Sequence, residues 1–113
     1  MILVLPLPPS VNNLYLNPRG THGSRRISSR YRAWRKRATA AMWGQRMEMF
    51  DGAVKISIVF EDNGKCDLDN LPKAILDHLV HHKIIVDDSR KYVRELNIKW
   101  GEVKGCVLEI QPI

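Results

Sequence analysis

The irregular order of strand-like and helix-like segments is the sequence feature that most constrains the fold. Residues 1–7 and 54–60 are rich in aliphatic side chains, and the apolar residues of the second stretch alternate with others, which predicts two strands. Residues 29–47 have helical spacing, and a second helix is expected from about Asp69. Because no strand–helix unit repeats, the order points to the α+β class, with two helices packed on one mixed sheet.

The rest of the chain predicts three more strands and one long loop. Residues 84–86 form a short apolar run, and residues 91–100 and 103–110 flank a glycine-containing turn, which predicts a short strand followed by a β-hairpin. Residues 9–28 are rich in Asn, Pro, Gly and Arg and predict a long basic loop. A chain of 113 residues suits one small domain, residues 1–113.

Both predicted helices have an apolar face. In the first helix the apolar stripe comprises Tyr31, Trp34, Ala38, Ala41 and Gln45, with Ser28 or Ser29 as the cap. Trp34 and the methionines are expected to pack in the core. In the second helix Pro72 is tolerated only in the first turn, so the helix must begin close to Asp69.

Positive charge is concentrated in the first half of the chain. The net charge is +6, and the first 50 residues hold nine Arg or Lys against one acid, whereas the remainder holds nine against eleven. A basic half favours a polyanionic partner such as nucleic acid, because each Lys or Arg that neutralises a phosphate releases a counterion. The alternative is an ordinary solvated basic face.

Two carboxylates precede the second helix. Asp67 and Asp69 lie two residues apart, so in an extended segment they project to the same side and can converge on one cation. Asp88, after the short apolar run, offers a third carboxylate, and Mg²⁺ prefers such oxygen ligands. The alternative is that Asp69 caps the helix and Asp67 is its solvated neighbour.

Lys73 lies one helical turn after Asp69, where its ammonium could stabilise negative charge on a reacting phosphate. The alternative is an ordinary ladder of i, i+4 ion pairs through Asp69, Lys73 and Asp77.

His78 and His82 have a zinc-compatible spacing, but no third ligand is evident, and structural or surface roles are expected for the histidines.

Nothing in the sequence indicates export or a membrane span. The apolar start is short and interrupted by prolines, and no stretch approaches the roughly 20 apolar residues that a spanning helix needs. Cys66 and Cys106 have no paired spacing and are expected to be reduced. A cytoplasmic protein is expected.

Two segments together resemble the signature of the RusA family of Holliday-junction resolvases. One is DxDNxxK at residues 67–73, followed by a paired Asp at residues 87–88 after a short hydrophobic run. The other is the opening PxPPSxN at residues 6–12. The resemblance covers nearly the whole chain in the same order. The chain departs from the pattern at Lys83, where relatives often carry glycine.

The resemblance implies a RusA-like fold and a homodimeric endodeoxyribonuclease of phage or prophage type, acting in DNA recombination and repair. It further implies dependence on Mg²⁺ or Mn²⁺ and resolution of four-way DNA junctions by paired symmetric nicks. By this resemblance Asp67, Asp69 and Asp88 are the catalytic, metal-holding carboxylates and Lys73 is the catalytic lysine. The expected DNA-binding residues, in the long loop and the basic helix, are Asn12, Arg19, Arg25, Arg26, Arg32 and Lys36.

Two other functions stay open at this stage. A non-catalytic DNA-binding module would use only the basic half and would not need the aspartates. A metal-dependent nuclease acting on RNA or on other branched DNA would share the site and differ in its substrate. Charge and motifs do not separate this nuclease from a resolvase; only the family resemblance does.

Overall fold

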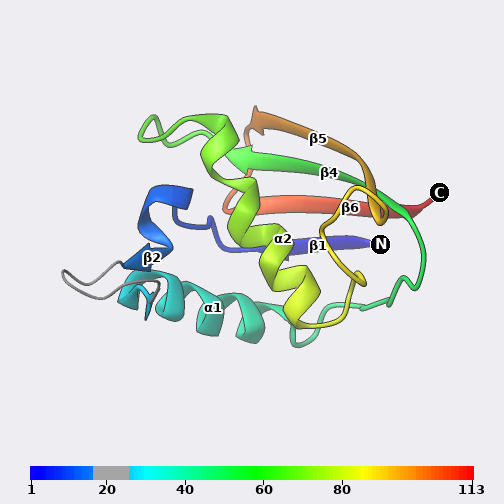
Figure 1. Cartoon of the computed structure of the whole chain (residues 1–113). Coiled ribbons are helices and arrows are strands. Elements are labelled where there is room, and N and C mark those ends of the chain that lie inside the picture. Colours follow the sequence, from blue (N-terminus) through cyan, green and yellow to red (C-terminus); the bar gives the residue numbers. More distant parts are fainter. Residues whose placement is uncertain (17–25) are drawn as a thin grey trace.

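A computed structural model of the chain describes residues 1–16 and 26–113 (Figure 1). Its main elements are two α-helices and a four-stranded sheet. In chain order the elements are β1 (Ile2–Leu5), the 3₁₀ turn η1 (Val11–Asn13), β2 (Tyr15–Leu16), β3 (Arg26–Ile27), α1 (Ser29–Met42), β4 (Val54–Glu61), the 3₁₀ turn η2 (Leu68–Asn70), α2 (Pro72–His81), β5 (Val93–Gly101) and β6 (Cys106–Pro112).

The main sheet is mixed and has the order β1-β6-β4-β5. β6 pairs antiparallel with both β1 and β4, whereas β4 and β5 run parallel. In β4 every second side chain, from Val54 to Phe60, is buried, because successive residues of a strand point to opposite faces of the sheet. The predicted α+β class, with helices packed on one mixed sheet, is confirmed.

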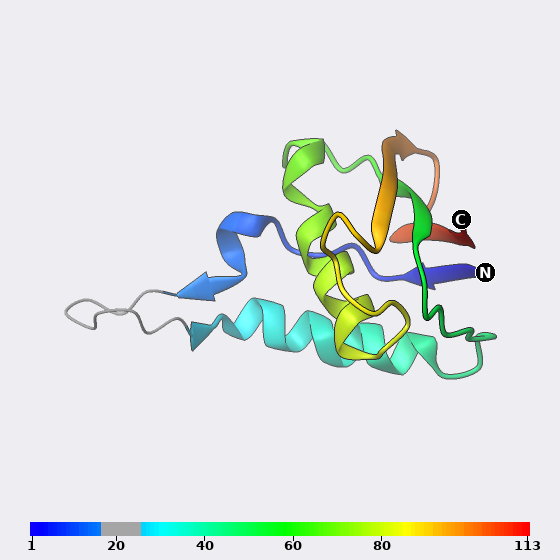
Figure 2. The ribbon, with the colours of Figure 1, turned by 45° about the vertical axis from the view of Figure 1, so that its right-hand side comes forward.

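The two helices lie on the same side of the sheet. Figure 2 shows the sheet close to edge-on, with α1 and α2 on one side of it. The buried residues of both helices join the inward-facing strand residues in one hydrophobic core. Trp34 and Met42 belong to this core as predicted, whereas Met49 is exposed.

The predicted hairpin of the last two strands is wrong. β4 lies between β5 and β6, so the connection after Gly101 crosses the end of β4. Glu61 fixes this crossing: the Gly105 N–H donates to Glu61 Oε1 at 2.7 Å, and the Glu61 N–H donates to the Gly105 carbonyl at 2.8 Å. Apolar alternation and a glycine turn identify two strands and a reversal, but they do not say which strand is the neighbour.

Helix α1 begins as predicted and ends early. The Tyr31 N–H donates to Ser28 Oγ at 3.0 Å, so Ser28 is the cap. The helix stops at Met42 rather than near Met47, because Trp43 is extended and Gly44 follows with φ of 86°. Gln45, predicted to lie on the helical stripe, instead uses its side-chain amide to bond both the N–H and the carbonyl of Val4 on β1.

Two predicted segments have a different local structure. Residues 84–86 are not a strand; Ile84 and Ile85 are buried in a turn region after α2. A run of three apolar residues indicates burial but does not fix backbone pairing. Residues 9–28 are not entirely loop, because η1 and the two-residue antiparallel pair of β2 and β3 lie within them.

Both cysteines are free, Cys66 half-buried and Cys106 buried. Within residues 1–16 and 26–113, no helix is both long enough and apolar enough to cross a membrane.

Candidate active site

Lys73 and Asp88 come together beside the first turn of α2. Lys73 Nζ lies 3.0 Å from Asp77 Oδ1 on the next turn of the helix and 3.3 Å from Asp88 Oδ2. Asp88 reaches Lys73 because the segment that follows α2 turns back beside the helix, as Figure 2 shows. The ion pair of Lys73 with Asp77, which the alternative of a helical ladder predicts, is present. The contact of Lys73 with Asp88 is not part of such a ladder, because Asp88 lies outside the helix.

The carboxylates around Lys73 keep it charged. They raise the pKa of Lys73, chiefly through the hydrogen bond to Asp77 and the attraction of that carboxylate, with a smaller contribution from Asp88. About half of the Lys73 side chain is exposed, so its ammonium group is reachable from solvent. The arrangement therefore presents a fixed positive charge beside a carboxylate.

Asp67 and Asp69 lie just before α2, and neither caps a helix. Asp67 stands at the N-cap position just before the η2 turn but makes no side-chain capping bond, and α2 has Leu71 at its cap position. Both carboxylates are exposed. Within the described residues, neither is engaged in an ion pair or side-chain hydrogen bond. The capping alternative therefore does not account for them.

The donor chemistry of this pair fits a hard divalent ion. Mg²⁺ takes oxygen ligands, keeps several waters and is held through one or two carboxylates. Asp67 and Asp69 provide two such groups, one directly before the η2 turn and one within it. However, in the part of the chain that the structure describes, no three His, Cys, Asp or Glu side chains lie close enough together to hold one ion. The structure thus joins Lys73 to Asp88 and does not gather Asp67, Asp69 and Asp88 into one cluster.

A polar hollow of about 410 Å³ surrounds the Lys73–Asp88 contact. Its walls come from β2, α1, α2 and the segment after α2. Its lining residues are Tyr15, Tyr31, Arg35, Lys73, Asp77, Val80, His81, Asp87 and Asp88. Burial, and secondarily the charge of Asp77, raises the pKa of Tyr31 to about 12, so its hydroxyl remains a neutral donor. The Arg35 guanidinium lies 5.6 Å from the centre of the Tyr31 ring.

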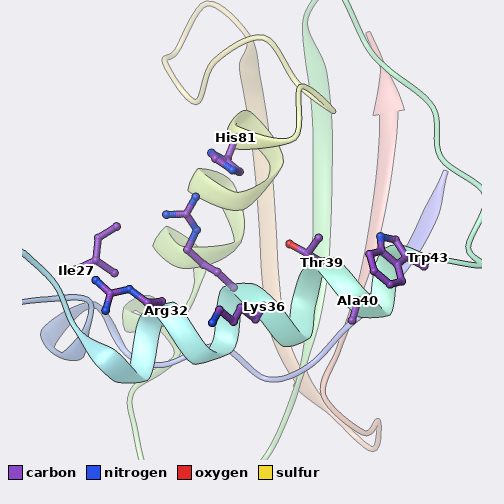
Figure 3. A pocket seen from close by; sticks show the side chains of 8 residues that line it. Ile27, Arg32, Lys36, Thr39, Ala40, Trp43 and His81 are labelled. Atoms are coloured by element: carbon purple, nitrogen blue, oxygen red, sulfur yellow. The ribbon is translucent and has the colours of Figure 1, made fainter.

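A second hollow, the α1 groove, has a volume of about 350 Å³ and runs along the outer face of α1. Arg32, Lys36, Ala40 and Trp43 follow one another along the helix, and His81 faces them from α2 (Figure 3). The remaining lining residues of the α1 groove are Ile27, Arg35 and Thr39. The helix itself holds five basic residues and no acidic one.

The two hollows adjoin. Arg35 and His81 line both of them, so the α1 groove leads to the Lys73–Asp88 contact. An anionic chain bound along α1 would meet positive charge from Arg32 to Lys73 and would reach the carboxylates at the end of this path.

The predicted DNA-binding residues fall into three groups. Arg32 and Lys36 are exposed and line the α1 groove. Asn12 and Arg26 are also exposed but do not line it. Arg19 and Arg25 lie outside the described residues.

The three neighbouring histidines at the end of α2 differ in environment. His78 is fully buried, with its ring 5.2 Å from that of Trp34 and its Nε2 3.2 Å from Met42 Sδ. Burial, helped by the charge of His82, lowers the pKa of His78 to about 3. His82 Nε2 lies 3.0 Å from Thr39 Oγ1, which links the two helices. The expected structural role therefore holds for His78.

Sequence reasoning missed Arg35, His81 and Tyr31 as parts of a site. Tyr31 is predicted to lie on the apolar stripe of the first helix, His81 to be structural or on the surface, and Arg35 is not singled out. Their association depends on how α1 packs against α2. A signal was present for Arg35, which follows Arg32 by three residues and therefore lies near it on the helix surface. Nothing comparable in the sequence brings His81 to α1.

Comparison with known proteins identifies the family. Residues 6–111 match the family described as Endodeoxyribonuclease RusA. The chain is also 26% identical, over 117 aligned positions, to the crossover junction endodeoxyribonuclease rusA of Enterobacteria phage HK97, and the alignment covers 97% of this chain and 95% of that protein. The match spans both the α1 groove and the Lys73–Asp88 site. The chain therefore belongs to the RusA family of endodeoxyribonucleases.

Proposed function

We propose that this endodeoxyribonuclease is a Mg²⁺-dependent, structure-specific enzyme that resolves Holliday junctions by paired nicks in recombination and repair. The observation that carries the proposal is the continuity of the α1 groove with the hollow around Lys73 and Asp88. A path of positive charge that ends at carboxylates is what a phosphodiester hydrolase needs. The printed name of the phage HK97 relative supports a crossover junction as the substrate.

In the proposed mechanism Asp67 and Asp69 would hold the divalent ion, and Asp88, which this structure does not gather into the same cluster, would join them when the ion binds. When bound, such an ion polarises the scissile phosphate and lowers the pKa of an attacking water. Lys73 supports the negative charge that develops on the phosphate, because its ammonium is fixed by Asp77 and Asp88. Mn²⁺ has the same preference for oxygen ligands and is expected to substitute.

Substrate binding is assigned to the basic residues of the first half of the chain. Arg32 and Lys36 lie one helical turn apart on the exposed face of α1, where they would contact phosphates. Asn12 and Arg26 are exposed on the segments before α1, and Arg19 and Arg25 belong to the same basic stretch of the sequence. Phosphate contacts of this kind hold the DNA in register without reading its sequence.

A panel of matched substrates tests the proposal. Purified protein with Mg²⁺ should cut a four-way junction much faster than a Y-fork, a duplex or a single strand built from the same sequences, and a chelator should stop the reaction. Equal cutting of all four substrates would replace the resolvase with a general nuclease. Binding without cutting at any Mg²⁺ or Mn²⁺ concentration would favour the non-catalytic module.

We further propose that the enzyme works as a homodimer in the cytoplasm. Each chain has one Lys73–Asp88 site, whereas a four-way junction with approximate two-fold symmetry must be cut in two opposed strands. Mixed dimers of wild-type and Asp69→Asn chains should nick one strand, so a supercoiled cruciform plasmid should give nicked circles where the wild type gives linear product. Linear product from a protein that sediments as a monomer at micromolar concentration would contradict the dimer.

A further inference from the structure

Trp43 is exposed at the end of the α1 groove. Its side chain is 79% exposed, whereas Trp34 is fully buried and Trp100 packs edge-on against Phe60, with ring centres 6.5 Å apart. A large aromatic side chain left in solvent loses the free energy that burial would give it, so its position requires an explanation.

The local backbone places Trp43 on the basic face of α1. Arg32, Lys36, Ala40 and Trp43 are spaced at four, four and three residues, which is the spacing of one face of a helix. The helix ends at Met42, and Gly44 follows in the left-handed region, so the chain turns away directly after Trp43. Ala40 lies between Lys36 and Trp43 along the α1 groove, and its small side chain leaves space between the lysine and the indole ring (Figure 3).

Resting on the proposed function, we propose that Trp43 stacks on a nucleobase of branched DNA while Arg32 and Lys36 hold the adjacent phosphates. Basic groups beside an aromatic platform are the combination that binds unstacked nucleotides, because the cations hold the backbone and every base offers a π face. Trp43, directly after the helix, is eleven residues from Arg32, which corresponds to about 16 Å along the helix axis. The α1 groove can therefore take both a backbone and a base.

This role would make Trp43 a determinant of substrate choice. In an intact duplex each base is stacked between its neighbours, so a stacking platform gains nothing from it. At a branch point the stack is interrupted, and a base there can exchange a DNA neighbour for the indole. Trp43 would then strengthen binding to junctions and leave binding to plain duplex unchanged.

Two substitutions separate stacking from mere apolar contact. Trp43→Leu keeps an apolar side chain and removes the π face, whereas Trp43→Phe keeps an aromatic ring. Binding is measured in a chelator, so that nothing is cut, to a synthetic four-way junction and to a duplex with the same arm sequence. We expect Trp43→Leu to lose about 5- to 150-fold in junction affinity, the range of one base–aromatic contact, with duplex affinity unchanged. Trp43→Phe should retain most of the junction affinity.

Tryptophan fluorescence gives an independent readout. Because Trp34 is buried and Trp100 half-buried, Trp43 is the tryptophan most accessible to a solvent quencher such as acrylamide. Adding junction DNA to the wild type should quench its emission and protect it from acrylamide. Duplex DNA should do neither, and the Trp43→Phe variant should respond to neither substrate.

Each other outcome overturns the inference. If the wild type prefers and cuts junctions while Trp43→Leu binds them equally well, the stacking is wrong and the proposed function stands. Equal losses on junction and duplex would make Trp43 part of a general DNA contact. A lower sedimenting mass of Trp43→Leu would make this surface a contact between subunits. If the wild type itself shows no preference for junctions, both the stacking and the resolvase function fail.

Discussion

Helices α1 and α2 cover the same face of the sheet and differ in the charges that they present to solvent. α1 carries five basic residues and no acid, and its exposed face forms the groove from Arg32 to Trp43. The start of α2 and the segments around it carry Asp67, Asp69 and Asp88 with Lys73. Under the proposed function this difference would be a division of labour, in which α1 binds the DNA backbone and the region around α2 performs the cleavage.

If this division is correct, a substitution near α2 should abolish cleavage and leave the affinity for junction DNA undiminished. Asp69→Asn keeps the shape of the side chain and removes a metal-binding charge. Cleavage should fall at least about a hundredfold, because a bound ion contributes several kcal/mol to stabilising the reaction. Junction affinity should stay near that of the wild type or increase, because a charge that repels phosphate is lost. Single-turnover cleavage and gel-shift titration measure the two effects.

The exposed Asp62, in the turn before this region, provides the matched control. Asp62→Asn removes the same charge outside the proposed ligand set and should cleave like the wild type. Mg²⁺-dependent cutting retained by Asp69→Asn would show that the carboxylate pair is not the site.

Substitutions on α1 should have the opposite result. Replacing Arg32 and Lys36 with Ala should weaken binding to all junction sequences alike and leave the cleavage rate at saturating DNA unchanged. The slope of log K against log[salt] should become shallower by about 0.9 for each phosphate contact that is lost. Arg94→Ala with Lys99→Ala, on the edge strand β5, is the control pair with the same loss of charge. An unchanged slope in the α1 variant would place the DNA elsewhere.

The contact between the helices should make stability depend on pH through His78. In the folded chain burial lowers the pKa of His78 from 6.5 to about 3, so below pH 6.5 the unfolded chain binds a proton that the folded chain does not. The contribution of the uncharged His78 to the stability of the fold is therefore fully present above pH 6.5. It should fall as the pH drops toward 3, by at most about 1.4 kcal/mol per pH unit from this residue.

Urea unfolding at several pH values between 7 and 4 measures this effect. His78→Leu removes the titrating ring from the core. The free energy of unfolding of the wild type should therefore fall relative to that of the variant as the pH drops. A constant difference across the range would show that His78 is not the titrating group.

The smallest expected effect concerns the turn that follows α2. Lys83 has φ of 59°, in the left-handed region that disfavours side chains with a Cβ. Glycine adopts this conformation without a steric penalty, so Lys83→Gly should stabilise the fold by about 1 kcal/mol or less. Lys83→Ala removes the same charge, keeps the Cβ and should give no gain. Thermal unfolding of the three proteins compares them, and a gain shared by both variants would indicate a charge effect instead.

The sequence predicts local features of this molecule better than it predicts which elements become neighbours. The alternation in β4 and the Ser28 cap are local effects, and both are found. Helix α2 begins at Pro72, three residues after the predicted start at Asp69, because the 3₁₀ turn η2 occupies Leu68–Asn70. The partner of β5 is set by a crossing over the end of β4, where Glu61 holds Gly105. Neither the spacing of apolar residues nor the residues of the turn specify which strand pairs with β5.

The same limit applies to the candidate site. The motif of residues 67–73 and the paired aspartates at 87–88 single out Lys73 and Asp88 as candidates, and the structure brings these two side chains into contact. The approach of His81 to Arg35 depends on the packing of α1 against α2, so it could not be predicted from spacing. The exposure of Trp43 depends on where α1 ends. The sequence predicts that end near Met47, whereas the helix ends at Met42.

The most direct test of the central claim maps where the α1 groove lies on the DNA relative to the cut. A photo-crosslinking amino acid such as p-benzoylphenylalanine at position 40 would replace Ala40, which is exposed and lines the α1 groove. The same amino acid in place of the exposed Asn97 on β5 is the control. Crosslinks from position 40 should fall on the cleaved strand within a few nucleotides of the incision, and position 97 should give none there. Crosslinks from position 40 on a distant arm, or none at all, would contradict a path from α1 to the carboxylates.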